Sequence, residues 1–109
     1  MAEIPLQKVN VIGLALNMTQ AAAGDTAQVG PNKHLVVRNG DAASHTVTCA
    51  VPGTDFTGAA KPDLATVIPA SGMAIIPLLD AYADPAQNGQ AVITYDATPA
   101  TLVRTVVAF

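Results

Sequence analysis

Charged residues are scarce in this chain. Asp, Glu, Lys and Arg make up 12% of its 109 residues, about half of the usual share in a globular protein. The five basic residues are scattered, and the formal net charge is −3. Because proteins that bind nucleic acid or anionic membranes normally present a basic patch, we expect neither as a partner. A surface so poor in charge is instead expected to be partly covered by another molecule.

Cysteine and aromatic residues are also rare. Cys49 is the only cysteine, so an intrachain disulfide is impossible. It alternates with Val47 and Val51, which predicts a buried, unreactive thiol. Aromatic residues make up 4% of the chain and none is Trp, so a platform for stacking sugars is not expected.

No apolar run is long enough to span a bilayer. The longest candidate, Val9 to Leu16, contains Asn10 and is far shorter than the ~20 residues that a spanning helix requires. Glu3 precedes it, which is atypical of a secretory signal. We therefore expect no targeting segment, and synthesis in the cytoplasm.

Motifs for catalysis and metal binding are not found. Ser44 and Ser71 fall where turns are expected, and no G-x-S-x-G motif occurs. His34, His45 and Asp41 could approach one another across a predicted turn, but metal sites normally show denser ligand spacing. Nearly all of the aspartates fall in expected turns or at the ends of expected strands, without the spacing of a calcium loop. We expect a protein that is not an enzyme and binds no cofactor or metal.

Short alternating segments dominate the rest of the sequence. The clearest is His34 to Gly53, where an apolar run, a turn at Asn39–Asp41 and an alternating run predict a β-hairpin. Pro77 predicts that its strand lies at a sheet edge. Further strands are expected at residues 9–18, 27–29, 64–68, 73–79, 90–96 and 101–109.

These segments predict an all-β fold. We expect a single antiparallel β-sandwich of about seven or eight short strands, with Greek-key or jelly-roll-like connections. The long connection from Pro52 to Asp63 favours a crossover between sheets over a simple meander. The chain divides into an N-terminal arm, residues 1–8, and one domain, residues 9–109.

Four apolar residues are candidates for an interface with a partner. Ile4, Pro5 and Leu6 form an apolar tip on the N-terminal arm, which either enters the chain's own core or contacts another molecule. Phe56 lies in the middle of the long connection and is expected to pack against an open end of the core.

Four segments follow a pattern known from one class of virion proteins. They are LVVRNG, HTVTCAVPGT, LATVIPASGMAIIPL and NGQAVITYDATPATLVRTVVAF. Their succession resembles the small head decoration, or cement, proteins of tailed bacteriophages of the actinobacterial type. The likeness covers about residues 24 to 109. One departure is Ser71, which precedes glycine in the turn of the third segment and changes only the length of that turn.

The resemblance implies a non-enzymatic structural protein. Such a protein binds the outer surface of the capsid, contacts the major capsid protein and stabilises the shell, as a homo-oligomer for which a trimer is favoured. It is made in the host cytoplasm and becomes part of the virion. The alternatives are a tail-associated or head-completion virion protein, and a β-sandwich module that binds carbohydrate or a host surface.

Overall fold

The computed structural model describes residues 2–8, 17–54 and 56–108. Within these ranges the chain consists of β-strands, two short 3-10 turns and connections, without an α-helix. The all-β prediction is therefore confirmed. The strand expected at residues 9–18 lies mostly outside the described residues, and Asn17 and Met18 are not in a strand.

The elements follow one another along the chain in a simple order. They are β1 (Ala2–Glu3), β2 (Leu6–Lys8), β3 (Thr19–Gln20), β4 (Asp25–Ala27), β5 (Lys33–Asn39), β6 (His45–Cys49), β7 (Leu64–Ile68), β8 (Met73–Pro77), η1 (Asp80–Tyr82), β9 (Ala83–Asp84), η2 (Pro85–Gln87), β10 (Gln90–Tyr95) and β11 (Leu102–Ala108).

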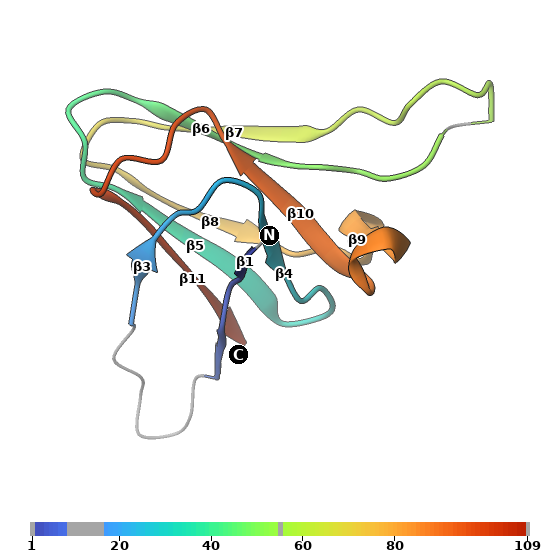
Figure 1. Cartoon of the computed structure of the whole chain (residues 1–109), viewed down its shortest axis with the longest axis horizontal. Helices are drawn as coiled ribbons and strands as arrows, with labels where there is room; N and C mark the ends of the chain where they lie inside the picture. Colours follow the sequence, from blue (N-terminus) through green and yellow to red (C-terminus); the bar gives the residue numbers. More distant parts are fainter. Residues whose placement is uncertain (1, 9–16, 55, 109) are drawn as a thin grey trace.

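The strands form two open sheets (Figure 1). Sheet A has the order β1-β4-β10-β6-β7, with β9 beside β10, and sheet B has the order β2-β11-β5-β8, with β3 beside β11. Most pairs are antiparallel, but β1 lies parallel to β4 and β2 parallel to β11. β8, which contains Pro77, is an edge strand as predicted.

Both sheets contribute to one hydrophobic cluster. Val47 and Ile93 enter it from sheet A, and Leu35 and Val106 enter it from sheet B, all fully buried. The alternation in the sequence explains this, because successive side chains of a strand point to opposite faces of the sheet. The strands β6 and β10 bury every second residue, so the period of two identified their inner faces correctly.

The predicted hairpin from His34 to Gly53 is wrong. β5 belongs to sheet B and β6 to sheet A, so the turn between them carries the chain from one sheet to the other. The side chain of Asn39 is fully buried, and its Nδ2 donates to the carbonyl oxygens of Ala43 at 2.9 Å and Ile68 at 3.2 Å. These bonds satisfy a buried amide only if the chain crosses between the sheets here.

The connection 52–63 is also not the predicted crossover. It joins β6 and β7, which are antiparallel neighbours in sheet A, and is therefore a long hairpin. An isolated bridge between Thr54 and Ala60 continues the pairing beyond the two strands. In Figure 1 this hairpin extends far from both sheets. The changes of sheet occur instead in the shorter connections β1–β2, β3–β4, β4–β5, β5–β6, β7–β8, β8–β9 and β10–β11.

The described part of the N-terminal arm is built into the fold. β1 joins sheet A and β2 joins sheet B. Ile4, between them, is 1% exposed and belongs to the hydrophobic cluster, and its N–H donates to the carbonyl oxygen of Thr26 at 2.8 Å. Of the two possibilities for this arm, its apolar tip enters the chain's own core through Ile4.

Candidate functional site

The candidate interface residues have different surroundings. Ile4 is buried and therefore not available to a partner, whereas Pro5 is exposed and Leu6 is half-buried against the core. Phe56 is fully exposed on the long hairpin. The expectation that Phe56 packs onto the core is therefore wrong, and its ring is open to contact with another molecule.

Apolar exposure is concentrated in one segment of the described chain, residues 56–79. We call it the exposed apolar segment. It comprises residues 56–63 of the long hairpin, the edge strand β7 of sheet A, the edge strand β8 of sheet B and the two residues after it. Its large exposed apolar side chains are Phe56, Leu64, Val67, Met73, Ile75 and Leu79. Sequence reasoning selected only Phe56, because alternation in an edge strand does not tell which of its two faces is solvated.

His45 lies between two carboxylates. Its Nε2 is 2.7 Å from Oδ2 of Asp41, and its Nδ1 is 2.9 Å from Oδ1 of Asp96. The hydrogen bond to Asp41, followed by the one to Asp96, raises the pKa of the His45 imidazole. This residue therefore ties the β5–β6 connection to the start of the β10–β11 connection.

The pKa values of the two carboxylates, Asp41 and Asp96, are both lowered. The hydrogen bond with His45 lowers the pKa of Asp41. For Asp96, burial acts to raise the pKa, but hydrogen bonds from His45 and from the backbone N–H of Thr46 outweigh it and the pKa is lowered. All three groups therefore favour the ionised state, as expected for an imidazolium between two carboxylates.

The suggested set of His34, His45 and Asp41 does not come together as a site. Asp41 contacts His45, but His34 lies on β5 in the other sheet, opposite Val107 and Pro77. Among the residues that the structure places, no group of three or more His, Cys, Asp or Glu side chains is arranged to hold a metal ion.

A buried ion pair joins the two sheets. Arg104 of β11 contacts the fully buried Asp25 of β4 through Nε at 2.7 Å and Nη2 at 2.9 Å. The Tyr95 hydroxyl donates to the same carboxylate at 2.7 Å, and Thr19 accepts from Nη1 of Arg104. Burial raises the pKa of Tyr95, and the hydrogen bond to Asp25 raises the pKa of Arg104. The polar groups of this network are paired with one another, which fits a structural role.

Asp25 was expected in a turn or at the end of a strand, and it is the first residue of β4. A signal for the ion pair was nevertheless present, because Arg104 shares the apolar face of its strand with Leu102 and Val106. A charge on an inner face requires a partner. The sequence does not show which carboxylate supplies it.

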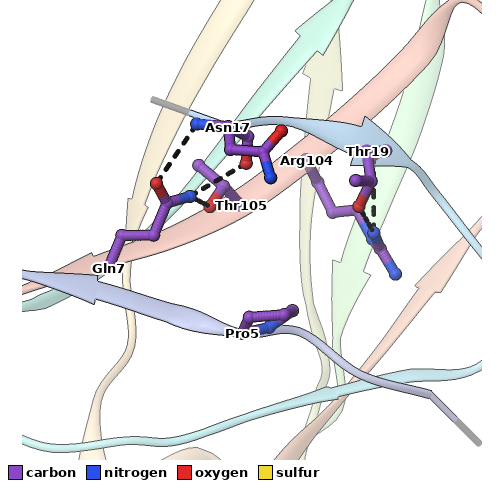
Figure 2. A pocket seen from close by; sticks show the side chains of 6 residues that line it. All are labelled: Pro5, Gln7, Asn17, Thr19, Arg104 and Thr105. Carbon is purple, nitrogen blue, oxygen red and sulfur yellow. Dashed lines mark hydrogen bonds between the residues drawn. The ribbon is translucent and has the colours of Figure 1, made fainter. Parts of the chain in front are cut away.

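A small pocket of about 180 Å³ lies beside this network (Figure 2). It is lined by Pro5, Gln7, Asn17, Thr19, Arg104 and Thr105. The Gln7 amide donates to the Asn17 carbonyl oxygen at 2.9 Å and to the Thr105 hydroxyl, and the Asn17 N–H donates to Gln7 Oε1 at 3.1 Å. Gln7 of β2 is thus hydrogen-bonded to Asn17 and to Thr105 of β11, so these lining groups are already paired with one another.

A wider and more open hollow lies at the base of the long hairpin. Pro52, Gly53 and Lys61 line it from the hairpin, and three alanines, two aspartates and a proline of the segment 80–86 line its other side. Cys49 is buried elsewhere, in the core, where burial raises the pKa of its thiol to about 11. The prediction of a buried thiol is confirmed.

Comparisons with protein-family models, with curated proteins and with solved structures find no match. The described part of the chain has no helix that is long and apolar enough to cross a membrane.

Proposed function

We propose that this chain is a non-enzymatic structural protein of a phage virion, which binds the outer surface of the capsid and stabilises the shell. In this proposal its two sheets form a β-sandwich, its partners are the major capsid protein and further copies of itself, and neither nucleic acid nor a membrane is bound. The four sequence segments that resemble decoration proteins support it.

The observation that carries the proposal is the exposed apolar segment. Its six large apolar side chains range from 45% to fully exposed, and all of them lie within residues 56–79. They lie on the long hairpin and on or beside edge strands of two different sheets, and we take this exposed apolar surface as the surface that a partner covers. The long hairpin projects from both sheets (Figure 1), and the ring of Phe56 on it is fully exposed and available to insert into a pocket of a partner.

The surrounding chemistry agrees with a protein partner. Residues 64–79 contain no charged side chain, so a strongly charged ligand would find no counter-charge there. Buried aromatic anchors surrounded by apolar contacts supply much of the energy in protein interfaces. Many copies on one shell also make a modest contact effective, because adjacent binding events reinforce one another.

The proposal is tested by sedimentation with capsids. Purified protein is mixed with shells assembled from the major capsid protein of the same phage, and the shells are pelleted. We expect the protein in the pellet and shells that resist heating better. Phe56→Ala should weaken the binding, whereas Gln28→Ala, an exposed position outside the segment, should not. Protein that stays wholly in the supernatant contradicts the proposal, and binding to isolated tails instead favours the tail-associated alternative.

A further inference from the structure

Among the residues that the structure describes, none pairs with one strand edge of sheet A. β7 is the last strand of this sheet, and β6 is its neighbour. On β6 the carbonyl oxygen of Thr46 accepts from Asp96 N–H at 3.1 Å, and the Ala50 N–H donates to Val92 at 3.0 Å. These residues therefore direct their backbone groups toward β10. Because the direction alternates from residue to residue along an antiparallel strand, Val47 and Cys49 direct theirs to the other side, toward β7.

The register then fixes which groups of β7 remain free. Leu64 and Thr66 lie opposite Cys49 and Val47 of β6 and bond to them. The intervening residues of β7, Ala65 and Val67, direct their N–H and C=O groups away from the sheet. The free edge therefore presents two donors and two acceptors in a row, and the Val67 side chain beside them is 65% exposed.

This edge lacks the features that usually protect a strand edge. Natural edge strands are blunted by Lys, Pro, inward charges or bulges, because a bare edge pairs with another strand. β7 reads LATVI, five residues without charge or proline. An edge of this composition is expected to be covered in the functional state of the protein.

We propose that β7 of a second copy of this chain covers the edge, antiparallel and about a two-fold axis that passes at Thr66. In this register Ala65 lies opposite Val67 of the second copy, so the free donors of one strand meet the free acceptors of the other. The side chains of Ala65 and Val67 are both exposed, so apolar side chains also meet across the axis. The same strand supplies both halves, as an isologous contact requires.

The charge pattern favours a second copy over a strand of unrelated composition. In this register Asp63 lies opposite Pro69 of the second copy, and not opposite Asp63 or Lys61, so no like charges face one another across the axis. Two uncharged strands therefore meet along their full length, and no charged group is buried without a partner.

The second apolar edge, β8, is less suited to the same contact. The Asn39 N–H donates to Gly72 at 2.8 Å and the Leu78 N–H donates to Lys33 at 3.0 Å, so by the same alternation Met73, Ile75 and Pro77 face outward. Proline has no N–H to donate, which shortens the row of donors on this edge. β8 therefore provides a matched control for β7.

The two-fold contact has a consequence that rests on the proposed function. The two long hairpins would project in opposite directions from a continuous sheet, each with an exposed Phe56. Two such tips on one particle would bind a repetitive surface more tightly than one tip. A two-fold pair also departs from the trimer that the family resemblance implies, so a measured mass decides between the two arrangements.

The experiment measures the mass of the pure protein in solution, without capsids, by size exclusion with light scattering over a range of concentrations. We expect twice the chain mass of 11.0 kDa for the wild type. Ala65→Pro removes one outward N–H and no bond to β6, and should give the single-chain mass. Ile75→Pro removes the equivalent outward N–H of β8 and should leave the double mass unchanged.

Several results would overturn the proposal. They are a wild type with the mass of one chain or of three at every concentration, an Ala65→Pro variant that keeps the double mass, and an Ile75→Pro variant that loses it. If circular dichroism shows Ala65→Pro to be unfolded, Val67→Lys replaces it, with Met73→Lys on β8 as its control. Since no shell is present, failure here is distinct from failure to bind capsids.

Discussion

The carboxylate of Asp25 in sheet A and the guanidinium of Arg104 in sheet B form a two-point ion pair across the core, 79 positions apart in the sequence. Paired charges that are fully hydrogen-bonded are tolerated in a core, but a single unpaired charge is strongly destabilising. The pair therefore makes the association of the two sheets depend on both residues together.

We predict that Asp25→Asn lowers the free energy of unfolding by about 3–5 kcal/mol, because it leaves the Arg104 charge buried without its partner. Urea unfolding followed by circular dichroism measures the change. The double variant Asp25→Leu with Arg104→Leu is the control and should lose less than the single variant, since no charge remains to be compensated. A double variant that loses as much as Asp25→Asn, or more, would show that the unpaired charge of Arg104 is not what destabilises the single variant.

The candidate interface residues Ile4 and Phe56 should separate in a stability measurement. Ile4→Ala removes a core side chain and is expected to lower the free energy of unfolding by about 2–5 kcal/mol. Phe56→Ala changes a fully exposed ring and should alter stability by less than about 0.5 kcal/mol. Chemical denaturation of both variants checks this. A large loss for Phe56→Ala would mean that its ring contacts the body of the protein.

Alternation in the sequence predicted where strands lie but not which strands pair. The strand at 64–68 was predicted with the same limits as β7, and the face carrying Val47 and Cys49 was predicted correctly. Pairing depends instead on contacts between distant residues. The buried Asn39 amide, which reaches Ile68 at 3.2 Å, directs the chain to the other sheet, and nothing local distinguishes it from an ordinary turn asparagine.

The exposed apolar segment could be predicted only in part from the sequence, for a related reason. An apolar residue at an edge and one in a central strand have the same local pattern, so the sequence does not distinguish the exposed Val67 and Ile75 from core residues. Ile4 was predicted as a contact residue because it lies near a chain end. In the structure β1 pairs with β4 and β2 pairs with β11, and Ile4 between them is buried.

We predict that the thiol of Cys49 reports on global unfolding. Its burial and its pKa of about 11 keep it protonated and inaccessible, and only the thiolate is a good nucleophile. A chromogenic disulfide reagent at neutral pH should therefore react slowly with the native protein and rapidly in denaturing urea. Destabilising the core with Ile4→Ala should accelerate the native reaction, whereas Gln28→Ala should not. Fast labelling of the native wild type would contradict the buried position.

The last prediction concerns pH and His45. The imidazole has a raised pKa, so its contribution to stability is complete below the ordinary His value of 6.5 and is lost as the pH rises through the raised value. Neutral imidazole has a single N–H and can donate to only one of Asp41 and Asp96. The lowered pKa values of these carboxylates act at the other end: their contribution is complete above the ordinary Asp value of 3.8 and is lost on further acidification.

Stability from this cluster should therefore be greatest between these two ordinary values. We expect His45→Gln to lower the melting temperature most at about pH 5.5 and least in alkaline solution, where wild-type His45 is neutral as well. Melting curves across the pH range measure the difference, and titration of the His45 ring signals by NMR gives the pKa directly. His34→Gln is the control, because His34 lies in the other sheet, away from Asp41 and Asp96. A His45→Gln deficit that stays constant with pH would show that the ring acts through packing alone.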